Sequence, residues 1–159
     1  MNTFKIFSIL FIVFILPVNA QINTEDALGL RVGDNDGLAF ELSYQRYLTE
    51  VKNQRLEFGL GLKDSHGLEY IKLVGLYELV SKLAGDYRWY VGAGGGIGAF
   101  KTDLVSDNLG LVAGVIGIEH STPTVPILFS LDFRPEYGFN DDYSDGIDFN
   151  IGLSMRIQF

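Results

Sequence analysis

The segment IDFNIGLSMRIQF, residues 147–159, alternates without a break between two kinds of side chain. Its odd-numbered positions carry large apolar residues, from Ile147 to Phe159, and its even-numbered positions carry small, polar or charged ones. Successive side chains of a β-strand point to opposite faces of a sheet. The pattern therefore predicts a strand whose two faces meet two different environments.

The same alternation recurs throughout residues 21–159, and little of that region has helical spacing. We expect strands of about ten residues at 27–33, 38–45, 55–63, 68–79, 87–100, 109–119, 127–134 and 147–159. Short turn-like connections such as 33–37 and 81–86 separate them, which favours antiparallel neighbours in an up-and-down order. The predicted fold class is all-β, a closed antiparallel eight-stranded up-and-down transmembrane β-barrel.

The two faces of the predicted barrel decide between a membrane protein and a soluble one. Eight strands enclose only enough room for side chains, so large apolar residues on every inner face would overfill the lumen. Facing lipid, the same residues meet no such limit. The opposite face then supplies a polar network inside the barrel: Arg31, Glu41, Arg55, Glu57, Glu78, Arg88, Glu119, Asp132, Arg134, Asp148 and Arg156. A soluble periplasmic barrel of the lipocalin type remains the alternative.

One predicted strand, 68–79, has an ambiguous alternation. We place Lys72 and Glu78 on its inner face, because a lysine on the lipid face in mid-strand costs about 2–4 kcal/mol. Aromatic residues near strand ends are typical of girdles at the two membrane interfaces. We expect such a role for Tyr44, Tyr47, Tyr77, Tyr87, Trp89, Phe100, Phe133, Tyr137 and Phe139.

The first twenty residues, MNTFKIFSILFIVFILPVNA, have the features of a secretory signal peptide. Lys5 precedes an apolar core that is too short to span a bilayer, and a small-residue ending leads to a predicted cut after Ala20. The predicted mature chain, 21–159, is exported as one barrel domain. With both of its ends in the periplasm, the connection at 33–37 and every second one after it face outward.

Composition excludes several classes of function. The chain has 12 basic and 20 acidic residues, a net charge of −8, which argues against binding of nucleic acid. It contains no cysteine, so disulfides and thiolate metal sites are absent. Acidic stretches at Asp34–Asp36 and Asp141–Asp145 do not complete a calcium-loop pattern. We expect no cofactor and no metal, and we interpret these stretches as solvated turns.

The stretch VGAGGGIGAFKT, residues 91–102, nearly matches the dinucleotide fingerprint G-x-G-x-x-G/A. That fingerprint must open a helix after a strand, whereas these glycines lie within a predicted strand. Gly92, Gly94, Gly96 and Gly98 share its inner face. We expect them to make room for arginine and tyrosine side chains from other strands and to permit sharp curvature.

Several motifs carry a resemblance to known proteins: GLYE (75–78), IGIEH (116–120), VPILFSLDFRPEY (125–137) and the final IGLSMRIQF (151–159). Over 21–159 the chain resembles small eight-stranded outer-membrane barrels of the OmpX/OmpA transmembrane type. More narrowly, its motifs are similar to those of an outer-membrane barrel family whose members are mostly uncharacterised. Ala113 stands where that family commonly has an acidic residue. The resemblance implies that the terminal Phe159 is an assembly signal for the barrel-assembly machinery.

The chemistry-bearing residues do not form a recognisable catalytic set. A deacylase of this architecture would use His, Ser and an acid, and His120 is flanked by Glu119 and Ser121. Neighbours along a strand point to opposite faces, so their adjacency is not a triad. We therefore expect a monomeric structural or surface-interaction barrel in the outer membrane of a Gram-negative cell, in contact with outer-membrane lipid. A lipid-modifying enzyme is the alternative, and a pore is disfavoured because eight strands leave no aqueous channel.

Overall fold

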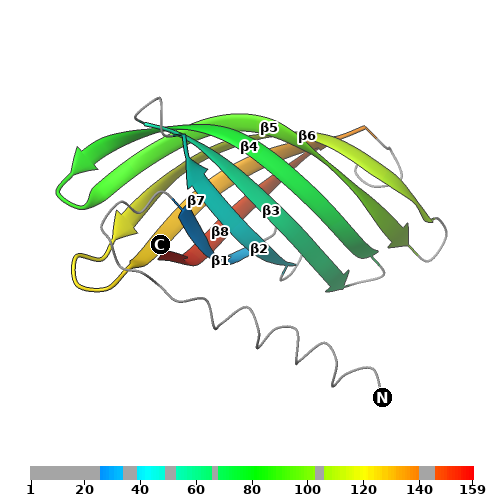
Figure 1. Cartoon of the computed structure of the whole chain (residues 1–159). Coiled ribbons are helices and arrows are strands. Elements are labelled where there is room, and N and C mark those ends of the chain that lie inside the picture. Colours follow the sequence, from blue (N-terminus) through cyan, green and yellow to red (C-terminus); the bar gives the residue numbers. More distant parts are fainter. Residues whose placement is uncertain (1–25, 34–38, 49–52, 66–67, 103–105, 140–145) are drawn as a thin grey trace, which may run out of the picture.

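The computed structural model describes residues 26–33, 39–48, 53–65, 68–102, 106–139 and 146–159. They form one closed barrel of eight strands (Figure 1). The strands are β1 (Asp26–Gly33), β2 (Ala39–Tyr47), β3 (Gln54–Ser65), β4 (Leu68–Ala84), β5 (Tyr87–Thr102), β6 (Ser106–Ser121), β7 (Ile127–Gly138) and β8 (Ile147–Gln158). The predicted signal peptide and the acidic stretches at 34–36 and 141–145 lie outside the described residues.

Every strand pairs antiparallel with its neighbours in sequence, and β1 also pairs with β8 to close the barrel. At that seam Leu30 lies opposite Met155, and Asp26 exchanges two backbone hydrogen bonds with Phe159. The predicted closed, up-and-down, eight-stranded barrel is thus confirmed. We call the end where β1 begins and β8 ends the terminal end, and the other the opposite end. Among the described residues, no helix is both long and apolar enough to cross a membrane.

Strands β4, β5 and β6 are longer than the expected ten residues, with 17, 16 and 16 residues. The predicted connection at 81–86 was too wide, because pairing with β5 continues to Ala84 through a register shift after Lys82. The chain reverses at Gly85, whose φ of 56° lies in the left-handed region that glycine adopts without strain. The β4–β5 hairpin thereby extends beyond β3 at the terminal end (Figure 1).

The outer surface of the barrel is apolar and the lumen is closed. In β8, every odd-numbered residue from Ile147 to Phe159 is exposed, and Leu153 reaches 65%. The alternate residues Asn150, Ser154 and Arg156 are buried inside. Burial is therefore opposite to that of a water-soluble protein, because large aliphatic and aromatic side chains face outward and charged ones face inward.

The glycines of β5 have a role that differs in part from the predicted one. A Cβ atom on Gly94 would collide with the backbone carbonyl oxygen of Gly75 in β4, and one on Gly98 would collide with that of Ile71. At Gly92 and Gly96 too the nearest atom is a backbone oxygen of β4, and no arginine or tyrosine side chain is among the nearest atoms of these four glycines. The expectation that they make room for arginine and tyrosine side chains is therefore wrong. Glycine is required here because β4 and β5 approach closely where the sheet curves.

Glycines that do make room for side chains lie on other strands. A Cβ on Gly152 in β8 would meet the guanidinium of Arg31, and one on Gly117 in β6 would meet the ring of Tyr90. The two kinds of glycine serve one purpose, because both allow a narrow barrel to enclose large polar side chains without enlarging its circumference.

Replacement of Gly94 by alanine should impair folding, because its Cβ must displace a backbone carbonyl of the neighbouring strand. We expect a loss of about 1–3 kcal/mol or more, the usual cost of overpacking. The measurement is the folded fraction after refolding into detergent, followed by the difference in gel mobility between unheated and heated samples. Gly75→Ala is the matched control, since its Cβ would lie at ordinary contact distance, 3.5 Å, from Phe58. Equal yields for the two variants would contradict this account.

Candidate functional site

The lumen holds a network of buried charges with Glu57 near its centre. The Glu57 carboxylate accepts hydrogen bonds from Gln45 Nε2 at 2.5 Å, Arg134 Nη2 at 2.9 Å and Arg156 Nη2 at 3.2 Å. Arg134 also donates from Nη1 to both oxygens of Glu41, at 2.9 and 3.0 Å. These contacts join β2, β3, β7 and β8 across the lumen, so Glu57 connects strands that are not neighbours in the sheet.

Arg156 completes this central cluster by binding two hydroxyl groups as well as a carboxylate. Its Nε donates to Ser43 Oγ and its Nη1 to Ser130 Oγ, both at 2.8 Å. The fixed fork of a guanidinium suits such a site, because its several donors lie in one plane and satisfy several acceptors together.

A second cluster lies toward the terminal end and is organised by Arg55, which is fully buried. Arg55 Nε donates to Glu78 Oε2 at 2.5 Å, and its Nη1 donates to Glu119 Oε2 at 2.6 Å. The guanidinium also lies 4.6 Å from the ring centroid of Tyr90, a cation–π distance. Arg88 lies 2.8 Å from the other oxygen of Glu119, with its side chain one-quarter exposed. One arginine thus bridges two carboxylates on β4 and β6.

Two further ion pairs lie nearer the opposite end. Arg31 donates from Nη2 to Asp132 Oδ1 and to Asn150 Oδ1, each at 2.6 Å. Lys72 donates to Glu136 Oε2 at 2.5 Å, and its Nζ lies 5.0 Å from the ring centroid of Tyr70. The first pair links β1 to β7 past the intervening β8, and the second crosses the lumen from β4 to β7.

Most of the residues predicted for the lumen are placed inside it. Arg31, Glu41, Arg55, Glu57, Glu78, Glu119, Asp132, Arg134 and Arg156 are buried, as is Lys72, and Arg88 is partly so. Asp148 differs, because it is exposed near the opposite end where β8 begins. Its place in the alternation predicted the correct side of the strand, but alternation does not predict depth in the barrel.

The sequence analysis missed several lumen residues. Glu136 is 4% exposed and Lys63 is 9% exposed, and neither was assigned to the network. Both follow the same alternation as the assigned residues, Glu136 being two positions after Arg134. With them the described lumen contains equal numbers of buried charges of each sign: Arg31, Arg55, Lys63, Lys72, Arg134 and Arg156 against Glu41, Glu57, Glu78, Glu119, Asp132 and Glu136.

The predicted polar network does not fill the whole lumen, because part of the interior is apolar. Along the inner faces of β4, β5 and β6, the barrel contains an apolar cluster beside the ion pairs. Its members include Val74, Leu76, Val80, Phe100, Leu109, Leu111, Ala113 and Val115. Much of the inner face of these three strands is therefore apolar and closely packed, while Lys72, Glu78 and Glu119 bring charges into the lumen from β4 and β6.

Two aromatic residues that we expected at the membrane interfaces belong to the interior. Phe100 is 2% exposed and joins the apolar cluster, and Tyr47 packs against it while its ring lies 5.8 Å from the Arg55 guanidinium. Tyr77, Tyr87, Trp89, Phe133, Tyr137 and Phe139 are exposed on the outside. The girdle prediction was thus wrong for Phe100 and Tyr47, because both occupy inward positions in the alternation of their strands.

This architecture is shared by barrels of known structure at low sequence identity. The N-terminal barrel domain of Pseudomonas aeruginosa OprF matches with a TM-score of 0.70 and 12% identity, covering 84% of this chain and 96% of that one. The fold is that of the small outer-membrane barrels. Neisserial surface protein A matches with a TM-score of 0.62 and 9% identity, covering 84% of this chain and 94% of that one. A designed transmembrane β-barrel matches with a TM-score of 0.57 and 14% identity, covering 87% of this chain and 98% of that one.

The likeness is one of structure alone. No protein-family model matches the chain, and no curated protein matches it in sequence. The feature shared with these barrels is therefore the fold of the barrel.

The structure does not bring His120, Ser121 and Glu119 together as a catalytic triad. The His120 ring packs against Tyr87, with ring centroids 4.6 Å apart. Ser121 Oγ accepts a hydrogen bond from Arg88 at 3.0 Å, and Glu119 is bound inside the lumen by Arg55. In the described part of the chain there is also no cluster of His, Cys, Asp and Glu able to hold a metal ion. The geometry at the described residues is that of structural ion pairs.

Replacement of Arg134 by alanine should destabilise the barrel strongly, because it leaves Glu41 without its arginine and removes one of the two arginines that bind Glu57. Loss of one partner from a buried ion pair costs about 3–5 kcal/mol. The measurement is the midpoint of urea unfolding in detergent. Arg46→Ala is the control, since that side chain is 58% exposed and lies 3.9 Å from Asp26, a pair worth about 0–1 kcal/mol. Similar midpoints for both variants would refute the structural role of the network.

Proposed function

We propose that this chain is an integral outer-membrane β-barrel with a plugged lumen, and that its role is structural or surface interaction. The observation that supports this most directly is the inverted burial of its side chains. Ile97, Leu153 and Phe139 are at least 65% exposed on the outside, whereas Arg55, Arg134 and Arg156 are at most 1% exposed inside.

The apolar outer surface is far larger than a soluble protein tolerates. Exposed apolar patches on soluble monomers rarely exceed a few hundred Å2. Here, large apolar residues are exposed on all eight strands and around the whole barrel. A closed barrel also satisfies its backbone hydrogen bonds internally, which is the requirement for a structure that lies in lipid. Both properties favour the membrane over the alternative of a soluble periplasmic barrel.

The contents of the lumen argue against a pore. Ion pairs cross it from several strands, and the apolar cluster of β4 to β6 fills the remaining side. An eight-stranded barrel has no further space for a continuous aqueous channel. What such a plugged barrel offers to its surroundings is its outer wall and its two ends. A surface-interaction role agrees with the likeness to a neisserial surface protein, although that likeness is one of fold.

The proposal also includes how the chain is exported, how it is assembled and its oligomeric state. Residues 1–20 direct the chain to the periplasm and are cut after Ala20, and the assembly machinery recognises the end of β8 with Phe159. Phe159 is well placed for this, because its side chain is 43% exposed at the terminal end of the outer wall. A single barrel closes all of its own strand edges, so it functions as a monomer in contact with membrane lipid.

In cells, the mature protein should remain in the outer-membrane fraction after a carbonate wash. Unheated samples should migrate differently from heated samples on a denaturing gel, because the closed ladder of hydrogen bonds resists detergent until it is heated. Fractionation by density gradient with marker proteins for each compartment provides the measurement. Recovery of the protein in the soluble periplasm would refute the membrane proposal.

A role as an outer-membrane lipid-modifying enzyme is the second candidate, and the geometry around His120 gives it little support. We expect the mass spectrum of lipid A to be the same in wild-type cells and in cells that lack the gene. A missing or added acyl chain in only one of the two strains would restore the enzymatic candidate, and His120→Ala would then test whether this residue is responsible.

A further inference from the structure

One row of lumen residues near the terminal end brings three polar side chains from three strands together. Tyr47, Arg55 and Glu78 are successive partners in the ladders of β2, β3 and β4. Arg55 and Glu78 are buried in the lumen, and Tyr47 packs against its apolar cluster. Side chains opposed in this way lie only about 4.5–5.5 Å apart at Cβ. The three strands therefore present polar groups to one small volume.

Each side chain of this row has one buried atom that makes no hydrogen bond to any described residue. These atoms are Tyr47 Oη, Arg55 Nη2 and Glu78 Oε1. Other atoms of the row are already bonded, since Arg55 Nε donates to Glu78 Oε2 and Arg55 Nη1 donates to Glu119 Oε2. Buried polar atoms of folded proteins nearly always have a hydrogen-bond partner, which can be an ordered water. The row therefore calls for a partner that can reach all three atoms.

We propose that a single water molecule binds within this row. It accepts a hydrogen bond from Arg55 Nη2, donates one to Glu78 Oε1, and makes its third contact with the Tyr47 hydroxyl. Buried waters typically make about three hydrogen bonds to groups that otherwise have no partner. Among the described residues, the direct hydrogen bonds of Arg55 reach only β4 and β6. The water thus joins β2 to the cluster that Arg55 organises.

The charges and the burial of the row select water over an ion or a larger ligand. Arg55 would repel a cation and Glu78 would repel an anion, so the partner is neutral. It must also accept from a guanidinium and donate to a carboxylate at the same time. Arg55 and Glu78 are both 0% exposed, which leaves no opening for a larger molecule beside them. Water is the smallest neutral molecule that meets these conditions.

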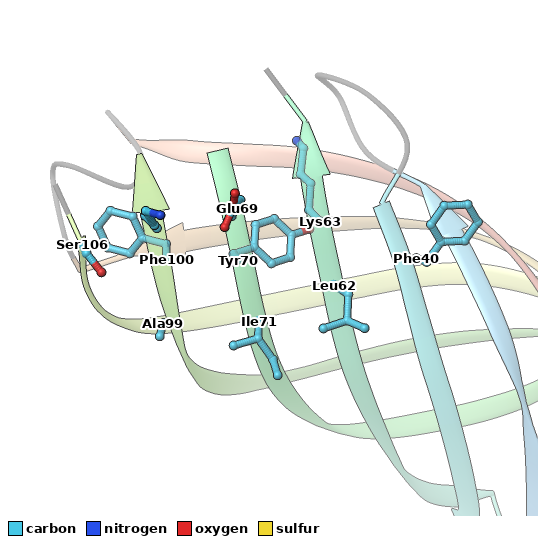
Figure 2. A pocket seen from close by; sticks show the side chains of 10 residues that line it. Phe40, Leu62, Lys63, Glu69, Tyr70, Ile71, Ala99, Phe100 and Ser106 are labelled. Atoms are coloured by element: carbon cyan, nitrogen blue, oxygen red, sulfur yellow. The ribbon is translucent and has the colours of Figure 1, made fainter. Parts of the chain in front are cut away.

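The row lies nearer to solvent at the terminal end than at the opposite end. Tyr47 is the last residue of β2, and the Arg88 guanidinium, with its side chain one-quarter exposed, lies 5.8 Å from the Tyr47 ring centroid. A groove of about 690 Å3 at the opposite end, beside Tyr70 and Phe100, contains no residue of the row (Figure 2). One molecule at this place completes hydrogen bonds and is not a channel, which the narrow lumen excludes.

The stability of a Tyr47→Phe variant tests the site by the sign of its effect. Loss of a hydroxyl that is bonded to the water should lower the folding equilibrium constant of the mature barrel about two- to tenfold, the usual weight of one hydrogen bond. Urea unfolding in detergent provides the measurement. A hydroxyl buried without a partner would instead destabilise the wild type, so an unchanged or raised constant in Tyr47→Phe would overturn the proposal.

Tyr44→Phe is the matched control, because it makes the same chemical change outside the row. The Tyr44 hydroxyl donates directly to Asp26 Oδ1 at 3.0 Å. Its removal therefore calibrates the loss of one hydrogen bond whose partner is known, and it should leave the water of the row in place.

A crystal structure of the mature barrel that shows ordered water provides the direct test. We expect one water within about 2.7–3.2 Å of both Arg55 Nη2 and Glu78 Oε1 in the wild type and in Tyr44→Phe. In Tyr47→Phe this water should be lost or displaced. If Tyr47→Phe does not fold, the wild-type structure decides alone. A wild type without this water would overturn the site and leave the proposed membrane role unaffected, because the inference does not depend on what surrounds the barrel.

Discussion

The constraint on which this structure depends is that every charge in a narrow, closed lumen must have a partner. Burial of an unpaired ion costs several kcal/mol, and eight strands leave no space for the water that would otherwise solvate it. The described lumen meets this constraint with equal numbers of buried acidic and basic side chains. Arginines supply most of the cations, and each contacts several groups: Arg55 bridges two carboxylates, and Arg156 binds two serines and Glu57.

The same constraint explains why the two halves of the barrel wall differ. The ion pairs need long side chains, including Lys72 and Glu78 from β4, and the volume between them near β4 to β6 is filled by shorter, apolar groups such as Val74. The glycines of β5 let β4 approach until backbone meets backbone, which bends this side of the sheet sharply. Close approach of β4 and β5 and ion pairs across the lumen thus both contribute to filling a narrow barrel.

The strand pattern of this fold could be predicted from residue alternation alone. The segment 147–159 shows why, since a change of face at every residue leaves only one assignment. The inward position of Lys72 also followed, because the opposite assignment would place its charge in lipid. Alternation says nothing, however, about depth or partners. It could not show that Asp148 lies exposed near an end, or that Arg55 meets Glu78 and Glu119, because these depend on how far each strand is staggered against the next.

The burial of aromatic residues and the ends of strands could not be predicted reliably from local sequence. Phe100 is an aromatic residue near a strand end, as expected at a membrane interface, but its side chain points inward. Its direction, not its residue type, decides that it is buried. The connection at 81–86 contains charged residues that suggest a turn, yet pairing with β5 extends β4 to Ala84. The pairing of strands, a property of two segments together, outweighs the local composition of either one.

The seam between β1 and β8 has a consequence for the order of folding. Residues that pair there, such as Leu30 and Met155, are more than a hundred positions apart, whereas every other ladder joins consecutive strands. The entropy of closing a loop increases with its length, and contacts distant in sequence form slowly. The seam is therefore the last ladder to form, and until then both of its edges present unpaired backbone. One of these two edges belongs to β1, which with eight residues is the shortest strand of the barrel. The edge that stays unpaired until the seam closes is therefore short.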